Sequence, residues 1–352
     1  MGMKRIVIRA DGNQQIAMGH VMRCLSIADE LRQMGADVIF VTAGDETEEL
    51  IRSRGFENHV LHSDFAHMEQ ELPSLLDFLK EYRPELILTD SYYVTDNYMN
   101  ALRGVSKTAY IDDLGQPVYP VDILINYNIY GSELPYEKYY VEKEIPLPER
   151  ILTGCDYAPL RAEFRQGRRS RIQERVTDIL ITTGGGDKED TSGRLCRKLL
   201  AERKEGQHAG MRYHVICGPF AQNRRELLEI AAEDDAFVIH DFVTNMSEFL
   251  MDFDLAVSAG GSTMYELCSM GLPTVCFTFA DNQRQQAEFF DRTTEVKNAG
   301  SMADRPEETI DRIAERLAQL EYDSALRQTV REQMLTLVDG RGAIRIAEAL
   351  LL

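Results

Sequence analysis

Residues 9–31 combine a histidine with the sequence signals of a ligand-binding loop. The preceding run RIVIR predicts a short strand, and apolar residues recur at helical spacing from Val21 to Leu31. Open α/β folds bind ligands where a strand, a polar loop and a helix start follow one another. His20, next to Gly19 at the predicted helix start, is therefore a candidate acid or base. A packed or solvated histidine is the alternative interpretation.

Acidic residues end two of the later predicted strands. The apolar run LILTD is typical of a strand buried on both faces and ends at Asp90, and TAYIDD ends at Asp113. In a parallel sheet, both ends lie at the same edge as the His20 loop, which favours a pocket there. Asp113 as a cap for the residues that follow is the alternative interpretation.

Two glycine-rich loops each lie between a predicted strand and a predicted helix, at residues 184–186 and 260–263. Missing Cβ atoms let phosphates approach the main chain, and a helix start offers free N–H groups with a partial positive charge. Neither loop has the G-K-[ST] or G-x-G-x-x-G pattern. Tight turns without a ligand would explain one such loop. The candidate phosphate-binding residues are Gly185, Gly260, Gly261, Ser262 and Thr263.

Two further polar residues follow the same pattern. Glu266 is one turn into the helix after Ser262, where a carboxylate suits the two hydroxyls of a ribose. A first-turn acid stabilised by the helix dipole is the alternative. Asn282 follows the predicted strand Thr274–Thr278 at the start of a helix, where its amide can reach a sugar or phosphate.

The composition excludes several classes of partner. A formal net charge of -19 argues against nucleic-acid and anionic-membrane partners. No stretch approaches the length of a membrane span and the chain starts into a strand, so we expect a cytoplasmic protein. The six cysteines and seven histidines lack the short spacings of metal sites, so we expect buried free thiols, no metal and no cofactor.

Strands and helices alternate through both halves of the 352 residues, which predicts βαβ units and parallel sheets. We expect an α/β protein of two Rossmann-like, doubly wound domains that face each other across a cleft, at residues 1–165 and 166–335. The basic run at residues 161–175 marks the boundary, as a solvated helix or a linker. Residues 336–352 are expected to form a C-terminal helix that packs on the first domain.

The pattern also predicts where each sheet ends. We expect the strand at residues 122–128 to be the last of the first half, followed by an irregular connector at 131–150. In the second half, Thr274–Thr278 is expected to close the sheet.

Several motifs along nearly the whole chain resemble the PseG/SpsG family. They are R-x-D-x-x-x-x-I-x-x-G-H-x-x-R-C-L-x-L/I-A around His20, Tyr-Ala-Pro-Leu-Arg161, Gly-Gly-Ser-Thr-x-x-Glu266, Asp281-Asn282-Gln283 and Asp-Gly-x-Gly-Ala-x-Arg345-Ile. This family comprises the UDP-2,4-diacetamido-2,4,6-trideoxy-β-L-altropyranose hydrolases of pseudaminic acid synthesis and their polysaccharide-biosynthesis relatives. The His20 segment is specific to it, whereas MurG-like GT-B glycosyltransferases share the glycine loops.

The resemblance implies a GT-B fold with UDP held mainly by the second domain. It also implies a metal-independent reaction in which water displaces UDP at the anomeric carbon with inversion, releasing free 2,4-diacetamido-2,4,6-trideoxy-L-altrose. The general base of the family falls on His20. Tyr92 and Asn282 match positions that line the sugar and phosphate region, and Arg161 matches a family arginine. Asp11, on the His20 loop, either orients His20 or binds a sugar amide.

The residues leave three functions open. The first is hydrolysis of a UDP-sugar, for which a largely neutral imidazole is a suitable base. The second is a glycosyltransferase that uses His20 on an acceptor hydroxyl instead of water. The third is a non-catalytic protein that binds a nucleotide sugar. The shape of the pocket in the first domain decides which sugar is bound. The pathway, for flagellin, a spore coat or another surface glycan, stays open. A monomer is compatible with any of the three.

Overall fold

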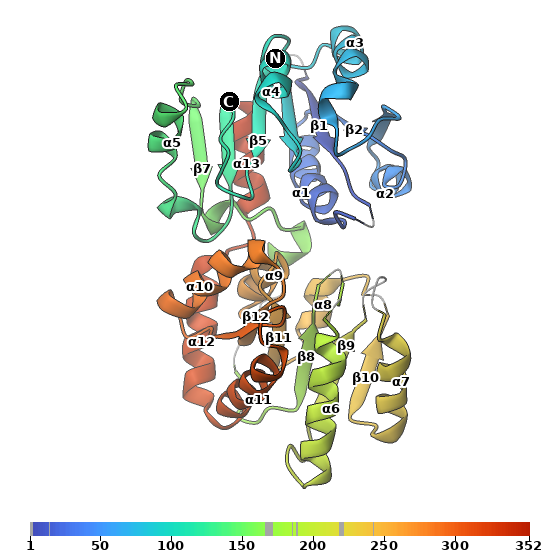
Figure 1. The fold of residues 1–352 in the computed structure, drawn as a ribbon, viewed down its shortest axis with the longest axis vertical. Coiled ribbons are helices and arrows are strands. Elements are labelled where there is room, and N and C mark those ends of the chain that lie inside the picture. The colour runs from blue at the N-terminus through green and yellow to red at the C-terminus, as the bar shows by residue number, and fades with distance from the viewer. Residues whose placement is uncertain are drawn as a thin grey trace. The chain divides into compact units, whose positions relative to one another are not determined.

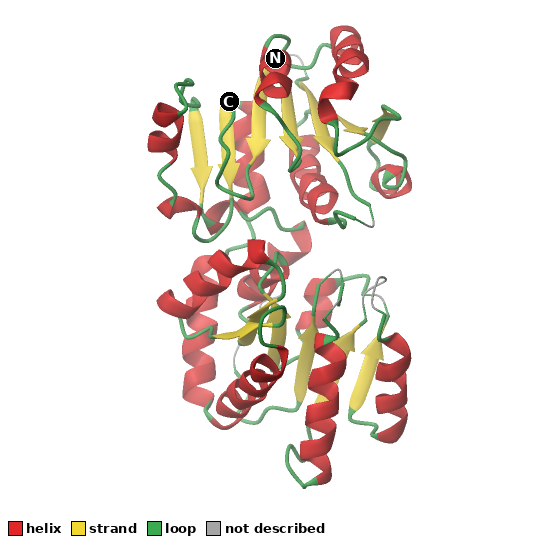
Figure 2. Ribbon diagram, viewed as in Figure 1, coloured by secondary structure: helices red, strands yellow, loops and turns green. Residues whose placement is uncertain are grey.

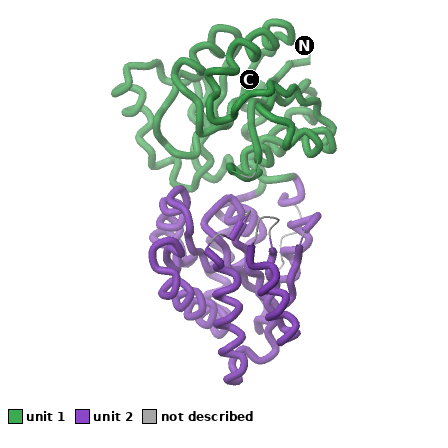
Figure 3. The backbone as a smooth tube through the Cα atoms, turned by 45° about the vertical axis from the view of Figure 1, so that its right-hand side comes forward, with its two compact units in different colours: residues 1–161, 340–352 green, residues 162–339 purple. Residues whose placement is uncertain are grey.

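The computed structural model describes residues 3–13, 15–165, 172–184, 186–187, 189–217, 222–241 and 243–352. The chain forms two compact units (Figure 3). Unit 1 comprises Met1–Arg161 and Gly340–Leu352, and unit 2 comprises Ala162–Asp339. Among the described residues, no helix has both the length and the apolar character needed to cross a membrane.

Unit 1 contains a seven-stranded parallel sheet with helices packed beside it (Figures 1 and 2). The strand order is β3-β2-β1-β4-β5-β6-β7. The strands are β1 Arg5–Ala10, β2 Asp37–Thr42, β3 Glu57–Val60, β4 Leu86–Asp90, β5 Lys107–Ile111, β6 Ile123–Asn126 and β7 Arg150–Thr153. The helices are α1 Gly19–Gln33, α2 Glu48–Ser53, α3 Leu72–Tyr82, α4 Asp96–Arg103, α5 Tyr136–Glu142 and α13 Gly342–Leu351, with short 3₁₀ helices η1 Met68–Glu71, η2 Gly131–Glu133 and η3 Cys155–Tyr157.

Unit 2 contains a six-stranded parallel sheet in the order β10-β9-β8-β11-β12-β13. The strands are β8 Asp178–Thr182, β9 Arg212–Ile216, β10 Phe237–His240, β11 Leu255–Ala259, β12 Thr274–Thr278 and β13 Asn298–Ser301. The helices are α6 Thr191–Lys204, α7 Arg224–Glu233, α8 Met246–Leu250, α9 Thr263–Met270, α10 Arg284–Thr293, α11 Pro306–Tyr322 and α12 Ser324–Leu337, with η4 Ala162–Arg165 and η5 Asp281–Gln283.

The central strands form because their residues are apolar on both faces. Every residue of β4 and every residue of β11 is buried, as expected of strands covered by helices on both sides. In both sheets the strand order reverses beside the first strand, between β1 and β4 and between β8 and β11. Ligands of open α/β sheets bind beyond the carboxyl ends of the strands at such a point. We therefore expect ligand-binding residues in the loops that follow these four strands.

The sheet edges differ from the sequence-based expectation. β6 is not the last strand of unit 1, because β7 pairs with it and α5 forms within the expected irregular connector. The α5 helix is held by Tyr140, which is buried and donates its hydroxyl hydrogen to the Tyr119 carbonyl oxygen over 2.8 Å. Nor does β12 close the second sheet, since β13 pairs beyond it.

The last helix belongs to unit 1, where α13 packs against α1 (Figure 3). Arg150 Nη1 donates to the Ala349 carbonyl oxygen over 2.9 Å, and Arg345 Nη1 donates to that of Asp156 over the same distance. At Gly342 the main chains approach closely. A Cβ there would lie 2.1 Å from the Ala158 carbonyl oxygen, so the contact requires glycine.

Candidate functional site

His20 is the second residue of α1 and only 4% exposed. The loop before it is shaped by Asn13, whose Oδ1 accepts from the backbone N–H groups of Gln15 and Ile16 over 2.8 and 3.1 Å. Ala17 then adopts a left-handed conformation with φ 59°. Such a conformation is uncommon for alanine and often occurs near functional loops. His20 therefore lies at the carboxyl end of the sheet, where the strand order reverses between β1 and β4.

Asp90 is the partner of the His20 ring. Its Oδ1 lies 2.7 Å from His20 Nδ1, and the carboxylate is 1% exposed at the end of β4. Burial by itself would raise the pKa of Asp90, but the charges of Arg23 and His20 and the hydrogen bonds from both outweigh it. That pKa is consequently held well below its usual range, and Asp90 is ionised at neutral pH.

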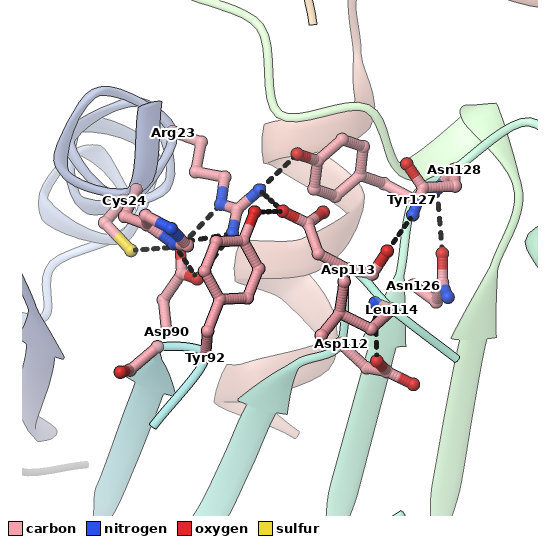
Figure 4. A network of polar contacts seen from close by, with 12 residues as sticks. Arg23, Cys24, Asp90, Tyr92, Asp112, Asp113, Leu114, Asn126, Tyr127 and Asn128 are labelled. Atoms are coloured by element: carbon pink, nitrogen blue, oxygen red, sulfur yellow. Dashed lines mark hydrogen bonds and ion pairs between the residues drawn. The ribbon is translucent and has the colours of Figure 1, made fainter. Parts of the chain in front are cut away.

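Arg23 connects the ends of three strands (Figure 4). Its Nε donates to Asp90 Oδ2 and its Nη2 to Asp90 Oδ1, each over 2.5 Å, while Nη1 donates to Asp113 Oδ2 over 2.7 Å. Nη1 also donates to the hydroxyl of Tyr127, just after β6. Because Arg23 follows His20 by three residues, both side chains lie on the same face of α1. The fork of the guanidinium fits two carboxylates at once.

Tyr92 contacts both Asp113 and the His20 ring. Its hydroxyl donates to Asp113 Oδ2 over 2.9 Å, and its ring meets the His20 ring edge to face with centroids 4.6 Å apart. Burial and then the negative charge of Asp113 raise the pKa of Tyr92 above its ordinary value. We call the set His20, Arg23, Asp90, Tyr92, Asp113 and Tyr127 the His20 cluster.

Asp11 has other partners. Its Oδ2 accepts from Arg9 Nη1 over 2.5 Å and its Oδ1 from the backbone N–H of Ala43 over 2.7 Å. Arg9 is fully buried and also forms a bidentate pair with Glu71, at 2.7 and 2.9 Å. Both carboxylate oxygens of Asp11 are therefore engaged, Oδ1 with the residue after β2 and Oδ2 with Arg9 of β1, and the carboxylate in contact with the His20 ring is that of Asp90.

In unit 2, the loop after β11 leads directly into α9. Gly260 is buried, and a Cβ there would meet Cys276 Sγ at 3.3 Å, whereas at Gly261 the nearest atom would be Gln283 Nε2 at 3.8 Å. The Ser262 side chain makes no capping hydrogen bond to α9, and Ser262 is exposed. The N–H groups of Met264 and Tyr265 donate to the carbonyl oxygens of Gly261 and Ser262 over 3.1 and 3.0 Å, so what the start of α9 offers an anion beside Gly261 is its partial positive charge.

The loop after β8 differs, because its helix is already capped. The carboxylate of Asp187 accepts from the backbone N–H groups of Thr191 and Ser192 over 2.7 and 3.0 Å. Ser192 Oγ and Asn223 Nδ2 also donate to it, over 2.5 and 3.0 Å. A protein carboxylate thus takes the place that an anionic ligand would occupy on α6. Gly185, a candidate from the sequence, lies outside the described residues.

Four further candidate residues from the sequence lie in α1, α9, η5 and at the end of the main segment of unit 1. Gly19 is the first residue of α1, with open space where its Cβ would be. Glu266 lies in the first turn of α9, after Thr263, and is half-buried. Asn282 is exposed in η5, and Arg161 is the last residue of the main segment of unit 1.

Sequence reasoning singles out neither Arg23 nor Tyr127, and it notes Asp90 only as an acidic strand end. A signal for Arg23 exists in its position three residues after His20. In unit 2 it also misses Gln286, whose Nε2 donates to the Gly261 carbonyl oxygen over 2.9 Å. Among the described residues, no group of three or more His, Cys, Asp or Glu side chains is arranged to hold a metal ion.

Comparison with known proteins gives both a domain and relatives. Residues 179–338 match the glycosyltransferase family 28 C-terminal domain. An uncharacterised protein of Methanocaldococcus jannaschii is 29% identical over 80% of this chain, which spans 57% of that protein's length. The spore coat polysaccharide biosynthesis protein SpsG of Bacillus subtilis is 22% identical, over 97% of this chain and 96% of SpsG. The UDP-2,4-diacetamido-2,4,6-trideoxy-β-L-altropyranose hydrolase of Campylobacter jejuni is 27% identical, over 55% of this chain and 65% of the hydrolase.

Solved structures confirm the fold class. MurG of Acinetobacter baumannii matches with a TM-score of 0.70 at 15% identity, covering 99% of each chain. At that identity the likeness concerns the fold alone. It agrees with two parallel-sheet α/β units of the GT-B type. In sequence the chain is thus similar to SpsG and to the altropyranose hydrolase, and its fold is of the GT-B type.

Proposed function

We propose that this protein hydrolyses a UDP-sugar at the anomeric carbon with inversion, with His20 as the general base. The substrate we propose is UDP-2,4-diacetamido-2,4,6-trideoxy-β-L-altropyranose, the molecule in the name of the C. jejuni relative. One observation carries the proposal, the 2.7 Å contact between His20 Nδ1 and ionised Asp90. It holds one ring nitrogen in place and leaves the other, Nε2, to act on water.

The chemistry needs a base and a site for the leaving group. Water attacks the anomeric carbon while His20 takes one of its protons, and the bond from that carbon to the phosphate oxygen breaks. The electron pair of that bond leaves with UDP. In this proposal the partial positive charge at the start of α9 stabilises the charge that develops on the phosphate. The proposal assigns to Glu266, in the first turn of α9, the role of accepting hydrogen bonds from the ribose hydroxyls.

A glycosyltransferase is the second candidate, and specific observations favour it. Unit 2 matches a glycosyltransferase family 28 domain, and the fold resembles MurG. A general base of the same kind would then act on an acceptor hydroxyl instead of water. The identity of the nucleophile therefore separates the two candidates.

The test is incubation of the purified protein with UDP-sugars in the absence of any acceptor. We expect release of UDP and free sugar in equal amounts, with the inverted anomer appearing first in proton NMR spectra. Turnover that appears only when an acceptor glycan is added would establish the transferase instead. Binding without turnover of any UDP-sugar, with or without acceptors, would contradict both reactions.

A further inference from the structure

We propose that Gln286 is a positioning residue for the anion site at the start of α9, because it fixes the peptide bond between Gly261 and Ser262. Gln286 does not contact the ligand itself but acts through the main chain of the glycine loop. The inference rests on the proposed function, which places the phosphates of UDP at α9. It deepens that function by naming the side chain on which the phosphate contact depends.

Both ends of the Gln286 amide are engaged inside unit 2. Nε2 donates to the Gly261 carbonyl oxygen over 2.9 Å, and Oε1 accepts from the Tyr265 hydroxyl over 2.7 Å. Gln286 is 3% exposed and Tyr265 is 1% exposed. A carbonyl oxygen can only accept, so the amide nitrogen must face Gly261, and the Tyr265 hydroxyl then donates to the other end. The Gln286 side chain therefore has one orientation that satisfies both partners.

This contact determines which way the peptide after Gly261 points. The Gly261 carbonyl oxygen also accepts from the backbone N–H of Met264 over 3.1 Å. Because a trans peptide is planar, the N–H of Ser262 points in the opposite direction, away from the buried Gln286. Among the described residues, that N–H has no acceptor. Glycine restricts its own main chain little, so the hydrogen bond from Gln286 is what holds this orientation.

A second side chain indicates that the space beside Gly261 suits a ligand. Gln283 is 9% exposed, and its Oε1 accepts from the backbone N–H of Phe279 over 3.1 Å. Its Nε2 lies 3.8 Å from the position that a Cβ on Gly261 would take, and it has no acceptor in the described part of the chain. Buried donors normally have a partner, so this one is typical of a site that a ligand completes. A diphosphate supplies acceptor oxygens there, at the positive end of α9.

The experiment is isothermal titration calorimetry of the full-length protein with UDP, and with uridine as a competitor of UDP. Gln286→Met keeps the length of the side chain and removes the amide. We expect the Kd for UDP to rise by about tenfold, because the peptide is no longer held toward the phosphate. The Kd for uridine, which has no phosphate, should stay within about twofold of its original value. A general loss of folding would weaken the binding of both ligands alike.

Two further variants separate positioning from folding. Tyr265→Phe removes the hydroxyl that holds Oε1 but leaves Nε2 able to donate to Gly261, so it should raise the Kd for UDP by about threefold. Gln285→Met makes the same substitution at the neighbouring, exposed position of α10 and should change neither affinity. Thermal unfolding reports whether each variant is folded. If Gln286→Met does not fold, Tyr265→Phe carries the test with the same pair of ligands.

The outcomes are separable from those of the proposed function. No loss of UDP affinity in folded Gln286→Met, or an equal loss for UDP and uridine, would overturn this inference even if the enzyme hydrolyses UDP-sugars. So would an unsubstituted protein that does not bind UDP. A loss confined to UDP would support the inference even if no UDP-sugar is hydrolysed.

Discussion

Asp187 Oδ1 accepts a hydrogen bond of 2.7 Å from the backbone N–H of Thr191 and so occupies the start of α6. At the corresponding place after β11, α9 begins at Thr263, and the Ser262 side chain makes no capping hydrogen bond. The two glycine loops look alike in sequence, yet the start of α6 holds a protein carboxylate and Ser262 supplies none to α9. The two loops should therefore respond differently to the same substitution.

The first prediction concerns UDP affinity. Gly261→Ala should fold, since its Cβ would meet only Gln283 Nε2 at 3.8 Å, but the added methyl should hinder phosphate from approaching the main chain. We expect the Kd for UDP to rise by about tenfold, the value of roughly one charge-assisted hydrogen bond. Gly186→Ala, where nothing lies within 4 Å of the added Cβ, should change the Kd little. Isothermal titration calorimetry measures both, and equal effects would contradict the distinction.

A second prediction concerns the proposed base. His20→Gln should lower kcat for UDP release by about 10² to 10⁴-fold, because the variant cannot take the proton from water. UDP affinity should change little. His67→Gln is the matched control, since His67 is an exposed histidine of unit 1 whose ring contacts Asp64. Steady-state assays of UDP release with the two variants provide the measurement, and full turnover by His20→Gln would remove His20 from the mechanism.

The third prediction follows from the depressed pKa of Asp90. A carboxyl whose pKa is lower in the folded than in the unfolded protein adds stability that is fully present above the unfolded value, about 3.9. That contribution is lost as the pH falls below it toward the folded pKa. Asp90→Asn should therefore lower the free energy of unfolding by about 3 to 5 kcal/mol near neutral pH, because it breaks a buried ion pair.

The difference between the two proteins should shrink as the pH drops below about 4. Urea unfolding followed by circular dichroism at a series of pH values measures it. Asp77→Asn serves as the control, because Asp77 is exposed and its contact with Lys80 is a surface pair. A difference for Asp90→Asn that stays constant from neutral to acid pH would show that its charge is not the source of the stability.

The fourth prediction concerns the return of the chain to unit 1. In Gly342→Ala the new Cβ would lie 2.1 Å from the carbonyl oxygen and 2.5 Å from the nitrogen of Ala158, and backbone atoms cannot rotate away. We expect a loss of about 1 to 3 kcal/mol of stability and faster hydrogen exchange in α13. Gly19→Ala places a methyl at the same position of another helix, its first residue, with nothing within 4 Å. Equal stability of the two variants would argue against the close contact.

Much of the architecture follows from the sequence by itself. Buried parallel strands consist of continuous apolar runs such as that of β4, and polar or glycine-rich loops follow them, so the alternation and the fold class are legible. The edge strands β7 and β13 are not, although each pairs with its neighbour in the folded sheet. The residues of β13, Asn-Ala-Gly-Ser, carry no strand signal of their own.

The candidate site also combines features that the local sequence determines with contacts that only the tertiary structure decides. The position of His20 at a helix start after a strand is a local feature, so the sequence determines it. Its contact with Asp90, 70 residues away, exists because β4 lies beside β1, and the bridge from Arg23 to Asp113 because β5 lies beside β4. Likewise, whether a helix start is open or capped depends on where one side chain such as Asp187 lies. Partners distant in sequence are chosen by strand order and packing, which the tertiary structure alone decides.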